Sequence, residues 1–108
     1  MDELKLPSNP ALKNFQEYVA KLEEERGFDR QTAAEKSMLL GEEIGELFKA
    51  MRKHEPNLRV DENSKRYDVA DELADVFLYL CAIANQYHID LEHAFREKEE
   101  KNKARVWK

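Results

Sequence analysis

Apolar residues recur every three or four positions along most of the chain, a spacing that places them on one face of an α-helix. Asn9-Pro10 reads as an N-cap followed by proline at the first helical position, and Gly27 reads as a C-terminal stop. The pattern therefore predicts a first helix between Pro10 and Gly27. Its apolar stripe consists of Leu12, Phe15, Val19 and Leu22.

The second predicted helix begins at a capping box, because Glu35 follows Thr32 by three residues. Pro56-Asn57 is expected to end this helix and to begin a polar connection that runs to about Asn63. Its expected core stripe consists of Leu40, Ile44, Leu47 and Met51.

The third predicted helix is apolar nearly all round between Leu73 and Ala84. A helix of this kind is normally buried on every side, and a four-helix protein of this size has little else to cover it with. We therefore expect a second subunit to cover part of it. Its expected core side consists of Val69, Leu73, Val76, Phe77, Leu80, Ile83 and Ala84, and the opposite flank of Leu78, Cys81 and Ala82.

Asp90 is the expected N-cap of a fourth helix, whose apolar stripe begins with Leu91, Ala94 and Phe95. No strand-like alternation stands out, and the 108 residues include only three glycines and three prolines. These features predict an all-α protein, a four-helix bundle that forms a single domain over residues 1–108 and assembles as a homo-oligomer.

Two glutamates occupy positions that the helical pattern reserves for apolar residues. Glu43 falls on the same helix face as Leu39 and Leu47, and Glu72 falls on the same face as Ile83. A buried, unpaired carboxylate is too costly to remain ionised, so it must be protonated, paired with a cation or bound to a metal.

Each of these glutamates has a second carboxylate three residues later, Glu46 after Glu43 and Asp75 after Glu72. If the second and third helices pack antiparallel, the two pairs meet across one gap. Oxygen ligands without histidine or thiolate suit Mg²⁺, with Mn²⁺ as a substitute, rather than zinc. The alternative is that these acids form buried salt bridges with lysines or arginines of other helices.

The last helix carries a second candidate site. Its apolar stripe continues at the i, i+4 and i+7 positions with Lys98, Asn102 and Arg105, which should face the interior or a cleft. A lysine and an arginine together suit phosphate oxygens. Alternatively, these cations only satisfy the end of the helix dipole, which taken alone is the favoured interpretation.

Other residues have weaker assignments. Glu42 is a spare carboxylate that could support a ligand or take a proton from water. Tyr79 either contacts a ligand or is a core tyrosine. Lys36 shares a face with Glu43 and could neutralise a carboxylate or phosphate, although a surface lysine is the favoured interpretation. Trp107 either stacks on a base or packs on a partner. The histidines are expected on the surface: His54, His88 and His93.

Charge and apolar runs exclude several classes of partner. The net charge is −5 with acids and bases interspersed, so there is no basic stripe to attract nucleic acid. The longest apolar run, Val76 to Ala84, is too short to span a bilayer, and the N-terminus lacks a signal peptide. Cys81 is the single cysteine, which fits a reducing compartment. We expect a cytoplasmic protein without membrane or nucleic-acid partners.

Three short motifs together resemble a known family. Glu42-Glu43-Ile44-Gly45-Glu46 followed by Glu72-Leu73-Ala74-Asp75 resembles the EExxE…ExxD signature of the MazG-like all-α nucleoside triphosphate pyrophosphohydrolases. Lys98, Asn102 and Arg105 match the K-x-x-x-N-x-x-R pattern near the end of that family's last helix. The resemblance runs from about Arg26 to Arg105, which is most of the chain.

The resemblance implies a homodimer or homotetramer of helical protomers that hydrolyses a nucleoside triphosphate. Water would attack the α-phosphorus and release a nucleoside monophosphate and pyrophosphate, with Glu42 helping to orient or deprotonate that water. The implied Mg²⁺ ligands are Glu43, Glu46, Glu72 and Asp75. The implied phosphate contacts are Lys98, Asn102 and Arg105, from the same or a neighbouring subunit.

The chain departs from the deoxycytidine triphosphate-specific relatives around the second helix. Those relatives tend to place aromatic residues before and after it, where this chain has Asp29-Arg30-Gln31 and Arg52-Lys53-His54. A modified or non-standard nucleotide is therefore an option. Two further alternatives are an enzyme like phosphoribosyl-ATP pyrophosphohydrolase, and a non-catalytic helical module that binds nucleotide or another protein.

Overall fold

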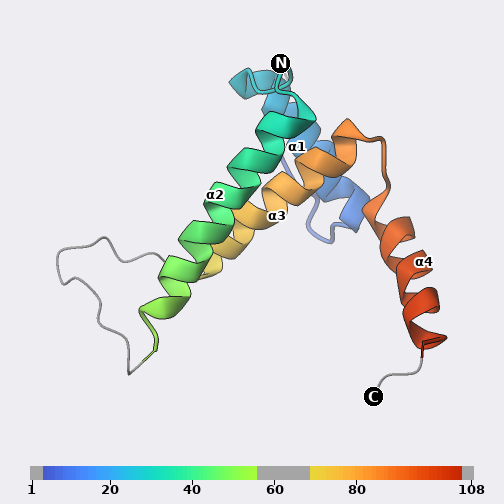
Figure 1. Cartoon of the computed structure of the whole chain (residues 1–108). Coiled ribbons are helices and arrows are strands. Elements are labelled where there is room, and N and C mark those ends of the chain that lie inside the picture. The colour runs from blue at the N-terminus through green and yellow to red at the C-terminus, as the bar shows by residue number, and fades with distance from the viewer. Residues whose placement is uncertain (1–3, 56–68, 106–108) are drawn as a thin grey trace. The chain divides into compact units, whose positions relative to one another are not determined.

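The computed structural model describes residues 4–55 and 69–105, which form four α-helices and no strand (Figure 1). This confirms the all-α prediction. The second helix ends at Arg52, with Lys53 as its C-cap, before the predicted stop at Pro56-Asn57. Pro56-Asn57, the polar connection and Trp107 lie outside the described residues. No helix in the described ranges is both long and apolar enough to cross a bilayer. The helices are α1 (Leu12–Arg26), α2 (Ala33–Arg52), α3 (Val69–Gln86) and α4 (Leu91–Lys103).

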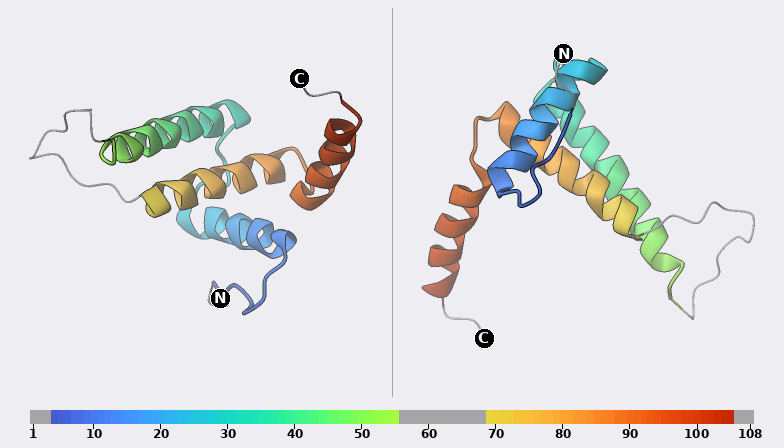
Figure 2. Two further views of the ribbon diagram at one scale, coloured as in Figure 1. Left: turned by 90° about the horizontal axis from the view of Figure 1, so that it is seen from below. Right: turned by 180° about the vertical axis from the view of Figure 1, so that it is seen from behind.

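The chain divides into two compact units, and α3 contributes to both. One unit, residues 31–80, contains α2 and the first part of α3. These two segments run side by side in opposite directions (Figures 1 and 2), which is the antiparallel pairing that the acidic pairs require. The other unit contains α1, the end of α3 from Cys81 onward, and α4.

Helix ends follow the sequence signals closely, with one correction. Thr32 and Glu35 form the predicted capping box, in which Glu35 N donates to Thr32 Oγ1 at 3.1 Å and Thr32 N donates to Glu35 Oε1 at 3.3 Å. The predicted Asn9 N-cap of α1 is wrong, because Ala11 is the N-cap and its N–H donates to Asn14 Oδ1 at 2.7 Å. Asn14 therefore supplies the capping oxygen from inside the helix. As a result, α1 begins two residues after Pro10, the predicted first helical residue.

Burial on α3 differs from the predicted core face. Leu73 and Leu80, both expected in the core, are 52% and 45% exposed, whereas Cys81 and Ala82 on the supposed outer flank are buried. A helix that is apolar all round carries no pattern to say which face turns inward. Its small residues end up buried in the unit that also buries Val19 and Leu22 of α1.

The expected stripes of α2 and α4 are also only partly covered. Met51 is exposed, and the other three residues of the predicted α2 stripe are half-buried. Phe95 of α4, expected on the inner face, is 70% exposed, and α4 has no buried residue. The chain therefore leaves apolar surface on three of its four helices.

Two residues adopt left-handed backbone conformations at helix ends, and they allow a paired stability test. Gly27, the predicted stop of α1, has φ of 78°, and His88 after α3 has φ of 56°. We expect Gly27→Ala to lower the free energy of unfolding by about 1 kcal/mol, because a Cβ is unfavourable in this conformation. His88→Gly should not destabilise the protein, since it removes such a Cβ. Urea unfolding of both variants checks this, and an unchanged midpoint for Gly27→Ala would contradict the assigned helix end.

Candidate functional site

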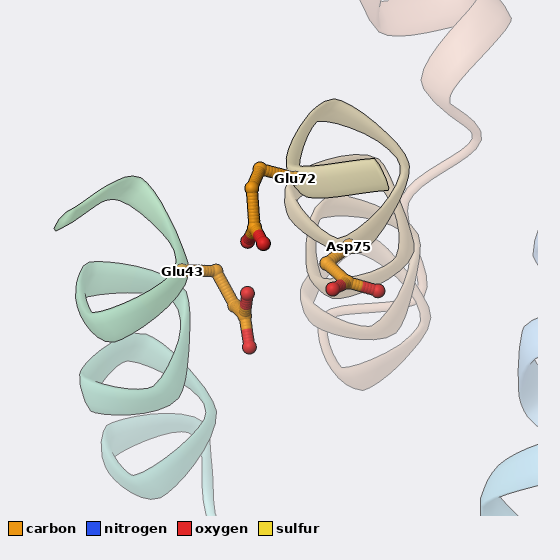
Figure 3. Close-up of side chains that lie close together, drawn as sticks. All are labelled: Glu43, Glu72 and Asp75. Carbon is orange, nitrogen blue, oxygen red and sulfur yellow. The ribbon is translucent and has the colours of Figure 1, made fainter. Parts of the chain in front are cut away.

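Three carboxylates from two helices converge within the unit formed by residues 31–80. Glu43 extends from α2, and Glu72 and Asp75 extend from α3 (Figure 3). One oxygen atom of each residue lies within 4.8 Å of the corresponding atoms of the other two. The antiparallel pairing of α2 with α3 and the three-residue spacing on α3 together produce this arrangement.

The three side chains differ in their access to solvent. Glu72 is only 7% exposed, Glu43 is half-buried, and Asp75 is exposed. The cluster therefore has a buried end at Glu72 and an open end at Asp75. A ligand would therefore reach the cluster from the side of Asp75.

Electrostatic repulsion within the cluster acts most clearly on Glu43. Its pKa is raised, first by burial, then by the charge of Asp75, by a hydrogen bond and the charge of Glu72, and by the charge of Glu46. Each charged contribution comes from a carboxylate, and none comes from a lysine or arginine of the described residues. This favours the interpretation of an acidic site over that of a buried salt bridge at Glu43.

Glu46 is the fourth predicted acid, and it lies close enough to raise the pKa of Glu43. Its Oε2 atom is buried and has no hydrogen-bond partner within the described part of the chain. A buried polar atom without a partner is rare and calls for a missing ligand, ion or water. A group of carboxylates offers an all-oxygen donor set, which suits a hard divalent cation.

Three further predicted residues lie on the same two helices. Glu42 is exposed beside Glu43, and it is absent from the groups that raise the pKa of Glu43. Tyr79 is half-buried, one helical turn after Asp75. Lys36 was expected on the surface, but it is only 2% exposed. The favoured interpretation of Lys36 as a surface lysine is therefore wrong.

The predicted phosphate contacts belong to the other unit, at the far end of α4. Lys98 is exposed and Asn102 is half-buried. Arg105 lies past the end of α4, where its N–H donates to the carbonyl of Asn102 at 3.1 Å, and its side chain is also exposed. Lys98 and Arg105 therefore do not face the interior, because α4 has no buried residue and ends before Arg105, and the alternative that the three residues face a cleft stays a prediction.

The remaining titratable candidates behave as surface residues. His54, His88 and His93 are exposed, as predicted, and His93 lies 3.3 Å from Glu97 on the surface of α4. Sequence reasoning missed two buried polar residues of α1, Gln16 and Glu23. The sequence does carry a signal for Gln16, because this polar residue shares a helix face with the apolar residues Leu12 and Val19. The same signal, a polar residue in an apolar stripe, identified Glu43.

Comparison with known proteins supports the same assignment as the acidic motifs. Residues 31–107 match the MazG nucleotide pyrophosphohydrolase domain. The chain is similar to dCTP pyrophosphatase 1 of Rattus norvegicus, with 36% identity over 69 residues that cover 62% of this chain and 41% of that protein. The matched family domain spans most of the chain and includes all four acids of the candidate site, so this chain belongs to the MazG nucleotide pyrophosphohydrolase domain family.

Proposed function

We propose that this protein is a Mg²⁺-dependent nucleoside triphosphate pyrophosphohydrolase, which cleaves a (deoxy)nucleoside triphosphate to its monophosphate and pyrophosphate. The observation that carries the proposal is the convergence of Glu43, Glu72 and Asp75 within 4.8 Å. Burial and the neighbouring carboxylates raise the pKa of Glu43 and so disfavour its ionised form. Family membership supports the same chemistry.

In this proposal Glu43, Glu46, Glu72 and Asp75 hold the cation. When bound, Mg²⁺ lowers the pKa of a water molecule, offsets charge on phosphoryl oxygens and orients the displacement. Glu72 is nearly buried and hydrogen-bonds with Glu43, so it fixes the position of that side chain. Asp75 is exposed and provides the side of the cluster that a triphosphate can reach.

Glu42 is the proposed residue that orients the attacking water and accepts its proton. It is exposed and adjacent in sequence to Glu43. No serine, cysteine or histidine nucleophile is needed for attack by water at the α-phosphorus, and the one cysteine, Cys81, is buried with its pKa raised to about 11 by burial. Water is accordingly the proposed nucleophile.

Lys98, Asn102 and Arg105 are the proposed phosphate contacts, supplied by the same or a neighbouring subunit. Two of them carry positive charge on exposed side chains, which suits the capture of an anion by a protein whose net charge is −5. Tyr79, half-buried near the acids, is proposed to contact the nucleotide. Lys36 is 2% exposed, so we leave it out of the nucleotide-binding set.

The relative's name makes dCTP the first substrate to test. However, the flanks of α2 carry charged and polar residues rather than aromatic ones, and Asp29, Arg30, Arg52 and His54 are exposed. Aromatic residues that could stack on a base are thus absent from these positions. We therefore include modified or non-standard nucleotides among the candidates.

Exposed apolar residues in the acidic unit favour assembly as a homo-oligomer. On the same observation, a non-catalytic protein-interaction module is the second candidate function. The residues concerned are Met38, Phe48 and Met51 of α2 and Leu73 and Leu80 of α3. A homodimer or homotetramer would cover this surface and complete the packing around α3.

A nucleotide panel tests the reaction. Purified protein incubated with Mg²⁺ and natural or modified (deoxy)nucleoside triphosphates should release pyrophosphate and a monophosphate in equal amounts, because attack occurs at the α-phosphorus. Coupled pyrophosphate and phosphate assays, with chromatography of the nucleotides, measure both products. Release of orthophosphate alone would contradict the proposed cleavage position, and no turnover of any nucleotide would favour the interaction module.

Glu43→Gln should change the stability of the metal-free protein and its enzymatic activity in opposite directions. The raised pKa means that ionisation of Glu43 destabilises the metal-free protein as pH rises above about 4.5. At pH 7 the variant should therefore melt at a higher temperature than the wild type in EDTA. It should lose turnover by at least about 100-fold and lose most of the stabilisation by Mg²⁺, since one ligand charge is missing.

Glu97→Gln is the matched control, because Glu97 is an exposed acid on α4. It should retain both turnover and the Mg²⁺-dependent shift in melting temperature. Equal stability of wild type and Glu43→Gln in EDTA, together with an unchanged Mg²⁺ shift in Glu43→Gln, would remove the acidic cluster as the metal site.

Light scattering tests the assembly. The wild type should be a dimer or tetramer at micromolar concentration, and Phe48→Lys should dissociate it, because Phe48 is an exposed apolar residue on α2. Lys101→Ala, on the exposed surface of α4, should leave the mass unchanged. A stable wild-type monomer would contradict the prediction of a second subunit.

A further inference from the structure

Helix α4 is attached to its unit with little apolar support. None of its thirteen residues is buried, and Phe95, its largest apolar side chain, is 70% exposed. Leu91 and Ala94, in its first turn, are half-buried. Apolar packing therefore holds only the beginning of this helix, and its direction depends on other interactions.

A buried amide, Gln16 of α1, supplies those interactions. Gln16 is 8% exposed, and its Nε2 donates to the carbonyl of Ile89 at 2.8 Å and to Asn85 Oδ1 at 3.2 Å. Its Oε1 accepts from the N–H of Leu91 at 2.9 Å. Asn85 Nδ2 donates in return to the backbone carbonyl of Gln16 at 2.9 Å. One side chain thus joins the end of α3, the following turn and the first residue of α4.

The turn between α3 and α4 is closed by its own backbone as well. Ile89 N donates to the carbonyl of Ala84 at 2.8 Å, and His88 adopts the left-handed conformation that this closure requires. Asp90 then caps α4 by accepting from His93 N at 3.0 Å. The turn is therefore a stiff element, and Gln16 fixes it to α1 rather than merely filling a gap.

Stiffness at the base of α4 determines where its far end lies. Asn102 follows Leu91 by eleven residues, about 16 Å along a helix. A tilt of about 10° at the base would displace Asn102 by about 3 Å, and misplacement by about 1 Å already weakens catalysis markedly. Lys98 and Arg105, on the same segment, would move with it.

We propose that Gln16 is a positioning residue for nucleotide binding, which sets the direction of α4 and so the location of Lys98, Asn102 and Arg105. The proposal rests on the function proposed above for those three residues. Gln16 precedes residue 31, where the match to the family domain begins.

The test compares Gln16→Met with Gln86→Met in the pyrophosphate assay at saturating Mg²⁺. Methionine keeps the length of glutamine but neither donates nor accepts strongly. Gln86 is an exposed glutamine at the end of α3 and serves as the matched control. We expect Gln16→Met to raise KM for the nucleotide by about tenfold with kcat changed by less than about threefold, because phosphate binding weakens while the acids are untouched. Gln86→Met should leave both constants unchanged.

A double-mutant cycle separates positioning from general destabilisation. If Gln16 acts through the cations of α4, Gln16→Met should raise KM much less when Lys98 and Arg105 are already alanine. A merely structural loss would lower the active fraction, and hence kcat, equally in both backgrounds. Asn85→Ala, which leaves the bonds to Ile89 and Leu91, is the milder variant. It should raise KM by a smaller factor. If Gln16→Met does not fold, the KM of Asn85→Ala tests the positioning role instead.

The possible outcomes distinguish this inference from the function on which it rests. Hydrolysis by the wild type with an unchanged KM in Gln16→Met and Asn85→Ala would overturn the positioning role alone. Equal KM effects in the wild-type and cation-free backgrounds would also overturn it. Absence of pyrophosphate release by the wild type with every nucleotide would overturn the proposed function itself.

Discussion

Repulsion among carboxylates is the constraint on which the functional interpretation of this structure depends. Glu43, Glu72 and Asp75 lie close together on two antiparallel helix segments. Glu46 adds a further charge, and one of its oxygens is buried without a hydrogen-bond partner among the described residues. Packing alone gives no reason to collect these groups, since isolated buried charge is unfavourable. A divalent cation would remove the repulsion, and it would supply the charge stabilisation that the proposed hydrolysis uses. On this account, the acidic cluster lowers the stability of the metal-free protein because its carboxylates are placed to bind a cation.

The arrangement of acids was accessible from sequence because it breaks a strong pattern. Glu43 interrupts an apolar stripe, and the capping box at Thr32 fixes the start of the helix that carries it. Glu72 and Asp75 follow from their three-residue spacing once the two helices pair. The structure brings these three together, and the family match includes them. Their roles as metal ligands are a proposal.

Other features were not accessible, for identifiable physical reasons. The sequence could not predict which face of α3 is buried, because apolar residues lie on both faces of the helix, Leu73 on one and Cys81 on the other. Phe95 was placed inside on periodicity, but periodicity does not reveal that α4 has too little neighbouring protein to cover it. Gln16, in contrast, carried the same signal as Glu43. Both are polar residues in an apolar stripe, but only Glu43 was identified from the sequence as a candidate site residue.

The most direct test of the account is the ionisation of Glu43 itself. NMR titration of its side-chain carboxyl carbon, in metal-free protein and in saturating Mg²⁺, measures the repulsion and its relief together. The account predicts a pKa raised above the ordinary value of 4.5 without metal, and a pKa well below that value with Mg²⁺. The same pKa in both conditions would contradict the central claim that a divalent cation is held between these acids.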